Sequence, residues 1–308
     1  MNGARPDVIL SFDLEDWHQL VHRDLGDPHW DRRNEAFERQ IAAVLALLDE
    51  LGVAATFFVL GLCARTYPDA VREIAARGHE LACHGYAHER VHVQTPDAFR
   101  ADVARCTELI EELTGRAPAG YRAPAFSITR ASAWAYDVLG ELGFRYDSSQ
   151  YDSPRIRGRL AGIPGEPYRL ELGGSKSLVE FPIAVARLGA RALPVGGGTY
   201  WRALPATLLF RALRAAASRS PAPVLYFHPY ELDPRPLRAE LPGGASASQR
   251  LRAARYDLYW NARRARIGRL LRRAAGEFRL LTYESYLAAA GGAERAGAKT
   301  LSGEGVLV

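Results

Sequence analysis

The chain has 308 residues, 48% of them hydrophobic, and its 40 basic and 35 acidic side chains leave a formal net charge of +5. Such a composition is ordinary for a globular protein, and the length suits one large domain or two small ones. No run of 18 apolar residues occurs, which excludes a membrane-spanning helix, and three cysteines without CxxC spacing exclude a disulfide framework. No export signal precedes the first predicted strand, so we expect a soluble, cytoplasmic protein.

Predicted strands and helices alternate along most of the chain. Val8 to Phe12 is a short apolar run typical of a buried strand, and apolar positions three and four apart over 34–51 indicate a helix that ends at Gly52. The later predicted elements are a strand at 53–60, a helix at 68–77, a strand at 79–83, a helix at 95–114, a strand at 119–122, a helix at 130–142, strands at 144–147 and 178–185, a helix at 205–217, a strand at 224–227, a basic helix at 248–275 and a strand at 278–282.

Two stretches show neither the periodicity of a helix nor that of a strand. Residues 150–177 are rich in Gly, Pro and Arg and are predicted to be a long loop, and the Gly- and Ala-rich residues 291–308 are predicted to be a disordered tail. The alternation elsewhere indicates parallel βαβ units, and therefore an α/β fold in a single domain over 1–290. Polar side chains that follow successive strands should then meet at one mouth, as in parallel barrels.

Two polar clusters follow predicted strands and carry metal-binding side chains. The first, residues 11–17, contains Asp13, Glu15 and Asp16, and the second contains His84 and His88. Histidines four apart share one face of a helical turn and can reach the same ion. Two imidazoles and one carboxylate suit zinc or a neighbouring divalent metal, and an open metal site activates water for hydrolysis.

The three carboxylates of the first cluster are candidates for two roles, general base and metal ligand. Asp13, at the strand end, is the candidate general base that takes a proton from metal-bound water. Either Glu15 or Asp16 is the candidate metal ligand, and the spacing does not choose between them.

Further candidates end other strands. Arg122, followed by Pro124, could hold Asp13 through a bidentate bond, although a structural ion pair would have the same sequence signature. His228 is a candidate general acid that protonates a leaving amine. Three glycines before Tyr200 and Trp201 allow close approach to a ligand, and these two rings could stack on a sugar. Pro124, Tyr200 and Trp201 are therefore the candidate substrate-binding residues.

The segment from Arg250 to Arg273 is strongly basic. It contains nine arginines, at positions 250, 252, 255, 263, 264, 266, 269, 272 and 273. A solvated helix face is the ordinary interpretation. The alternatives are attraction to an anionic polysaccharide, peripheral contact with a membrane that carries a lipid-linked intermediate, or a partner protein. No nucleic-acid-binding module accompanies the charge, so we expect no nucleic-acid partner.

In combination, these motifs resemble the polysaccharide deacetylases of the NodB-homology type, carbohydrate esterase family four. The resemblance rests on the acidic motif at 11–17, HxxxH at 84–88, RxP at 122–124, the strand end at 147–149 and the late histidine His228, in family order. It implies an irregular (β/α)7-type barrel. It also implies that Asp13 is the base, that Arg122 positions it, that His228 is the acid, and that a second carboxylate with His84 and His88 holds the metal.

Two motifs depart from the common pattern of that family. Adjacent aspartates are replaced by Asp13-Leu14-Glu15-Asp16, and the late motif reads Tyr226-Phe227-His228-Pro229-Tyr230-Glu231. Both variants resemble the branch associated with bacterial exopolysaccharide loci, which is related to metal-independent allantoinases. The two ligand histidines argue against the metal-independent relatives.

The resemblance predicts a zinc-dependent hydrolase that removes N-acetyl groups from an amino-sugar glycan or precursor, in exopolysaccharide biosynthesis. Its expected partner is the N-acetylated carbohydrate. One alternative is a hydrolase of a small or cyclic amide, of the allantoinase or imidase kind. Another is a non-catalytic glycan-binding protein, which the complete set of candidate residues disfavours.

Overall fold

A computed structural model describes residues 5–152, 160–188, 191–289, 297–300 and 307. In this part of the chain a central sheet runs in the order β10-β1-β2-β3-β4-β5-β7, and each neighbouring pair is parallel. These strands are β1 (Asp7–Leu14), β2 (Thr56–Val59), β3 (Glu80–Cys83), β4 (Gly120–Tyr121), β5 (Tyr146–Asp147), β7 (Ser177–Glu180) and β10 (Val224–Phe227).

The sheet curves until its two ends meet. Beyond β7, Ile183 forms a parallel bridge with Val224 of β10, and the Ala184 amide donates to the Val224 carbonyl over 3.0 Å. The described strands therefore form an irregular barrel, and the predicted α/β architecture is confirmed.

Buried aromatic side chains stack across the barrel strands. Phe12 of β1 is in register with Phe57 of β2 and with Phe227 of β10, and the Phe12 and Phe57 ring centroids lie 5.3 Å apart. Strands covered on both faces are expected to be apolar throughout, and seven of the eight residues of β1 are buried. The polar exceptions at the end of β1 therefore stand out.

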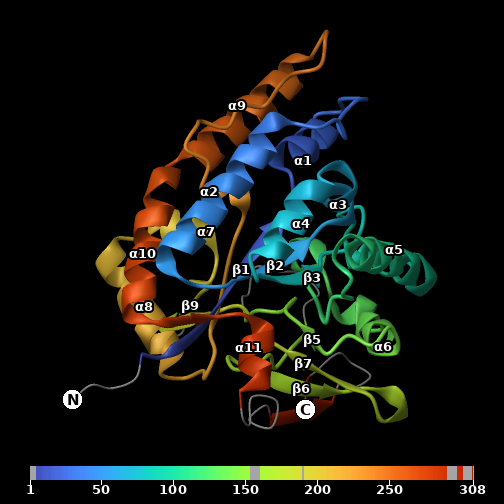
Figure 1. Cartoon of the computed structure of the whole chain (residues 1–308), viewed down its shortest axis with the longest axis vertical. Coiled ribbons are helices and arrows are strands. Elements are labelled where there is room, and N and C mark those ends of the chain that lie inside the picture. Colours follow the sequence, from blue (N-terminus) through green and yellow to red (C-terminus); the bar gives the residue numbers. More distant parts are fainter. Residues whose placement is uncertain (1–4, 153–159, 189–190, 290–296, 301–306, 308) are drawn as a thin grey trace.

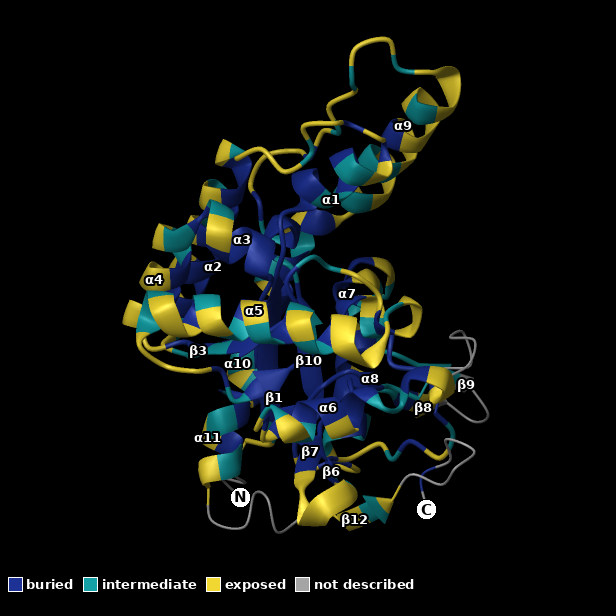
Figure 2. Ribbon diagram, turned by 90° about the vertical axis from the view of Figure 1, so that its right-hand side faces the viewer, coloured by how far each residue is buried: buried dark blue, intermediate teal, exposed yellow. Residues whose placement is uncertain are grey.

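Helices surround the barrel and turn their apolar stripes inward, so Figure 2 shows buried strands inside a shell of helices with exposed outer faces. Asn34 caps α2 and Thr95 caps α5. The helices are α1 (Trp17–Asp24), α2 (Glu35–Leu51), α3 (Gly61–Thr66), α4 (Pro68–Ala76), α5 (Pro96–Thr114), α6 (Ala135–Glu141), α7 (Gly198–Ala203), α8 (Ala206–Ala217), α9 (Ala247–Asn261), α10 (Ile267–Glu277) and α11 (Tyr283–Ala288).

The predicted helix at 248–275 is in fact two helices, α9 and α10. The chain breaks at Arg263, which has a left-handed φ of 53°, and the 3-10 turn Arg264–Arg266 follows. Arg264 is buried and donates to the backbone carbonyl of Tyr230 over 2.7 Å. Other arginines of this segment pair with carboxylates of the same chain, such as Arg272 with Glu50 at 2.6 Å.

Two predictions of irregular structure were wrong. The predicted loop at 150–177 contains β6 (Tyr168–Glu171), which pairs antiparallel with β7, and the predicted disordered tail contains β12 (Gly297–Thr300), which pairs with β6. The rest of the tail, except Leu307, lies outside the described residues. The other strands are β8 (Ala186–Leu188), β9 (Arg191–Leu193) and β11 (Arg279–Leu281).

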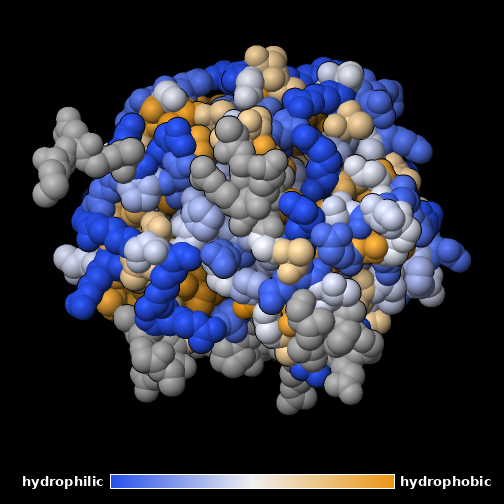
Figure 3. Space-filling view, turned by 90° about the horizontal axis from the view of Figure 1, so that it is seen from below, coloured by the Kyte–Doolittle hydropathy of each residue, from blue (hydrophilic) through white to orange (hydrophobic). Residues whose placement is uncertain are grey.

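Helix α9 projects from one end of the molecule, beside α1 at the top of Figure 1. Figure 3 shows the opposite end, where hydrophilic residues cover most of the coloured surface. Among the described helices, none combines the length and the apolar character needed to cross a bilayer.

A pair of buried acids lies beneath the barrel mouth, on neighbouring strands. Asp147 of β5 is in register with Glu180 of β7, and the Ser149 amide donates to both carboxyl groups, over 3.0 and 3.1 Å. Burial raises the pKa of Glu180, and the adjacent Asp147 raises it further. Because two like charges cannot both be accommodated there, the folded protein retains a proton that the unfolded chain releases.

This proton predicts a pH dependence of stability. The unfolded chain loses the Glu180 proton near its ordinary pKa of 4.5, whereas the folded chain keeps it to higher pH, so the free energy of unfolding should fall as the pH rises above that value. Glu180→Gln should flatten this fall, because the amide carries no proton to lose. Urea denaturation at several pH values would measure the free energy of unfolding of both proteins. If this energy falls with pH as steeply in the variant as in the parent, the shared proton is contradicted.

A second prediction concerns the close approach of β4 and β5. A Cβ atom on Gly120 would lie 1.9 Å from the Tyr146 ring, so Gly120→Ala should destabilise the fold by about 1–3 kcal/mol. Gly276, inside α10, has no neighbouring atom within 4 Å of such a Cβ, so Gly276→Ala should be neutral or stabilise by up to about 1 kcal/mol. Chemical denaturation of both variants checks the contrast, and equal effects would refute it.

Candidate active site

The barrel mouth brings together side chains from four strand ends. Asp13 lies in β1, with Glu15 just beyond it, His84 follows β3, Arg122 follows β4, and His228 follows β10. All five side chains are buried or nearly buried.

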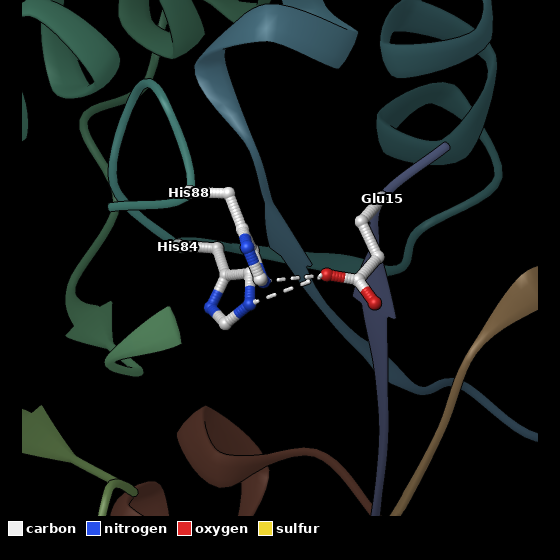
Figure 4. A group of neighbouring side chains, drawn as sticks. All are labelled: Glu15, His84 and His88. Carbon is white, nitrogen blue, oxygen red and sulfur yellow. Dashed lines mark ion pairs between the residues drawn. The ribbon is translucent and has the colours of Figure 1, made fainter. Parts of the chain in front are cut away.

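Glu15, His84 and His88 form the candidate metal centre (Figure 4). Their ligand atoms lie within 4.8 Å of one another. The Glu15 Oε2 atom is 2.9 Å from His88 Nε2 and 3.9 Å from His84 Nε2. The spacing of the two histidines suggested a shared helical turn. They lie instead on a loop, in which Gly85 and His88 have φ values of 74° and 55°.

The environment of His84 prepares it as a ligand. Its Nδ1 atom lies 2.8 Å from the Arg122 carbonyl, which can only accept, so Nδ1 carries the proton and Nε2 presents its lone pair to the site. Burial lowers the pKa of His84 to about 4, and neighbouring His88 lowers it as well, so the ring is neutral at pH 7. A neutral imidazole with a fixed tautomer is the form that binds a metal.

Glu15 is held in its charged form. Burial raises its pKa, but His88, His228 and His84 outweigh burial and bring the pKa well below the usual range. The Tyr230 hydroxyl donates to Glu15 Oε1 over 3.2 Å, which leaves Oε2 facing the histidines. Two nitrogen donors and one carboxylate oxygen fit a divalent cation such as zinc, with coordination positions left for water and substrate.

Asp16, the alternative ligand, has a different place in the structure. Its carboxylate is fully buried, accepts from the His18 amide over 2.8 Å and from the Tyr67 hydroxyl over 2.6 Å, and caps the N-terminus of α1. Both of its oxygens are therefore occupied. The geometry brings Glu15, and not Asp16, to the two histidines.

Asp13 is fixed by Arg122. The Arg122 Nη1 atom donates to Asp13 Oδ1 over 2.6 Å, and the guanidinium also donates to the Ser148 carbonyl, the Ser148 hydroxyl and the Tyr283 hydroxyl. It lies over the ring of Phe58, with its Cζ atom 4.0 Å from the centroid. The bond to Asp13 is single, not bidentate as the sequence suggested, because the other guanidinium nitrogens are used by Ser148 and Tyr283.

His228 faces the carboxylates of the site. Its Nε2 atom is 3.3 Å from Glu15 Oε1 and 3.9 Å from Asp13 Oδ2, and its Nδ1 atom is 3.3 Å from Glu231. Burial lowers the pKa of His228, but Glu15, Glu231 and Asp13 outweigh burial and raise the pKa to about 9. The ring is therefore protonated at neutral pH and can give up a proton.

Several residues around these groups were not predicted. Tyr230 stacks on His228 with ring centroids 4.8 Å apart, and Trp260 of α9 meets the Tyr230 ring edge-on at 5.0 Å. Tyr283 reaches Arg122 from α11. A usable signal existed for Tyr283, because it follows the last predicted strand as the other site residues follow theirs. No sequence signal links Trp260 to the site.

The three predicted substrate-binding residues are placed differently from one another. Trp201 is fully buried, its indole N–H donates to the Val195 carbonyl over 2.9 Å, and its ring meets Phe227 edge-on, so the prediction that it stacks on a sugar was wrong. Tyr200 is half-buried on α7, and Pro124 is buried close to Arg122 in the sequence. Substrate binding by these two residues stays a prediction.

Comparison with known proteins finds two family models that each match part of the chain. Residues 26–146 match the family model of polysaccharide deacetylases, and residues 148–288 match a domain of unknown function, DUF3473. The first match contains His84, His88 and Arg122, whereas Asp13 and Glu15 precede it and His228 lies in the second.

Two curated relatives are deacetylases by name. A peptidoglycan deacetylase-like protein of Gibberella zeae is 31% identical over 46% of this chain, and a peptidoglycan deacetylase of Helicobacter pylori is 30% identical over 48%. The matches cover 38% and 46% of those proteins, so the chain spans less than half of the length of each.

Solved structures share the fold at low identity. A structure from Mycobacterium smegmatis, described as a polysaccharide deacetylase, has a TM-score of 0.65 and 24% identity over 98% of this chain and 96% of its own. The Puue allantoinase has a TM-score of 0.57 and 16% identity over 92% of this chain and 90% of its own. With the family match at 26–146, these findings show that this part of the chain is similar to polysaccharide deacetylases, and that the chain shares the fold of solved structures from that group.

Proposed function

We propose that this chain is a metal-dependent hydrolase that removes N-acetyl groups from an amino-sugar glycan or its precursor. The observation that carries the proposal is the assembly of Glu15, His84 and His88 beside both Asp13 and His228. Deacetylation of an amide needs an activated water, a base and an acid, and this arrangement holds a candidate for each. Glu15, His84 and His88 would hold the metal.

A divalent metal, when bound there, supplies Lewis acidity toward water and toward the amide carbonyl. Asp13 takes the proton of the attacking water, and its Oδ2 is the atom available for this, because Oδ1 is held by Arg122. His228 then gives its Nε2 proton to the leaving amine, while Glu231 holds Nδ1. Arg122 and Glu231 act through Asp13 and His228, and both are positioning residues.

The finer parts of the proposal are zinc as the metal, an N-acetylated carbohydrate as the partner and a role in exopolysaccharide biosynthesis. Zinc is favoured by the donor set of two imidazoles and a carboxylate. The carbohydrate is supported by the names of the relatives. The biosynthetic role rests on the variant motifs at 13–16 and 226–231 alone.

Acetate release tests the proposal directly. Purified protein incubated with N-acetylglucosamine oligomers should release acetate, lose this activity with a chelator and regain it when zinc is added. Retained activity after chelation that removes all bound metal would contradict metal dependence. Absence of acetate release from zinc-loaded protein would contradict the deacetylase proposal and favour another amide substrate.

A pair of isosteric variants separates the two neighbouring carboxylates. Glu15→Gln removes a charged ligand and should weaken zinc binding on the order of 100-fold or more, whereas Asp16→Asn keeps the acceptor that caps α1 and should bind zinc within a few-fold of the parent. Calorimetric zinc titration measures both affinities. Thermal unfolding of the metal-free variants shows that each is folded, and equal losses of zinc affinity would refute the assignment of Glu15.

A further inference from the structure

Tyr259 of α9 is an exposed aromatic residue that the structure holds in place. Its side chain is 48% exposed, yet its hydroxyl lies 2.9 Å from the Thr199 hydroxyl, and the Cζ atom of Arg202 lies 4.8 Å from its ring centroid. The Arg202 guanidinium also donates to the Tyr259 backbone carbonyl over 2.6 Å. The neighbouring Leu258 is more exposed, at 77%, and no such contact to it occurs among the described residues.

A continuous series of ring contacts connects Tyr259 to the candidate general acid. Tyr259 meets Trp260 edge-on with centroids 5.0 Å apart, Trp260 meets Tyr230 edge-on at 5.0 Å, and Tyr230 stacks on His228 at 4.8 Å. The series begins inside the site and ends at the surface. We call its four residues, Tyr259, Trp260, Tyr230 and His228, the aromatic wall.

Arg202 makes the outer part of the wall rigid. Its buried guanidinium lies 4.8 Å from the Tyr259 ring and 4.9 Å from the Trp260 ring, and its Nε atom is 3.5 Å from Glu231. Cation–π contacts with a desolvated arginine are among the stronger ones. Holding an exposed ring in this way lowers the entropy lost when a ligand stacks on it.

We infer that Tyr259 and Trp260 form a subsite for a pyranose ring, adjacent to the position of the acetylated sugar. The apolar face of a pyranose matches an aromatic ring, and the hydroxyls of Thr199 and Tyr259 offer hydrogen bonds at its edge. The inference rests on the proposed function. It transfers to α9 the stacking role that the sequence had suggested for Trp201, which the fold buries.

The subsite makes the substrate an oligosaccharide. If Tyr259 and Trp260 form this subsite, a single N-acetylglucosamine bound at the metal centre does not need Tyr259, whereas a pentamer uses both places. Tyr259→Ala should therefore raise the KM for the N-acetylglucosamine pentamer about 3- to 10-fold, with kcat unchanged and with no effect on the monomer. Tyr259→Phe keeps the ring and should stay within about twofold of the parent. Leu258→Ala, an equally conservative truncation of an exposed neighbour, is the matched control.

Calorimetric titration with the pentamer in the presence of chelator separates binding from catalysis. Weaker binding in Tyr259→Ala, but not in Leu258→Ala, supports the subsite even if the parent releases no acetate, and in that case only the proposed function fails. The subsite is overturned if Tyr259→Ala binds the pentamer as the parent does, if the parent does not bind it, or if Tyr259→Ala impairs monomer and pentamer equally.

Discussion

The rest of the site depends on the ion pair and hydrogen bonds of the Arg122 guanidinium. It is fully buried, donates to Asp13, Ser148 and Tyr283, and lies on the face of Phe58. The backbone carbonyl of Arg122 fixes the tautomer of His84. A buried charge is tolerated only when it is paired and its donors are satisfied, so the strand ends around it must keep their relative positions. One residue thus aligns Asp13 with His84.

Local patterns predicted most of the barrel. The apolar run of β1 and the stripe of α2 with its glycine stop are properties of short segments, and the structure reproduces both within a few residues. The convergence of Asp13, His84, Arg122 and His228 also followed from strand alternation, since parallel strands end at a common edge. The choice between Glu15 and Asp16 did not follow, because it depends on Tyr67, which is 51 residues from Asp16 in sequence.

The errors arise where tertiary contacts decide the outcome. Three glycines before Trp201 suggested close approach to a ligand, but the chain turns there into α7 and directs the indole into the core. The arginine pattern suggested one long helix, and a left-handed Arg263 divides it. Trp260, just before the break, contacts the Tyr230 ring, and Arg264, just after it, donates to the Tyr230 carbonyl, so the most basic part of the chain packs against the site.

The pairing of β1 with β10 has a consequence for the order in which the site is assembled. The candidate metal ligands lie between positions 15 and 88, whereas Tyr230 meets Glu15 across a separation of 215 residues. Closing so long a segment is a late and slow event in folding. During synthesis, Glu15, His84 and His88 are all present long before His228 is added. The three side chains of the candidate metal centre therefore leave the ribosome early, whereas the candidate acid joins them only when β10 docks on β1.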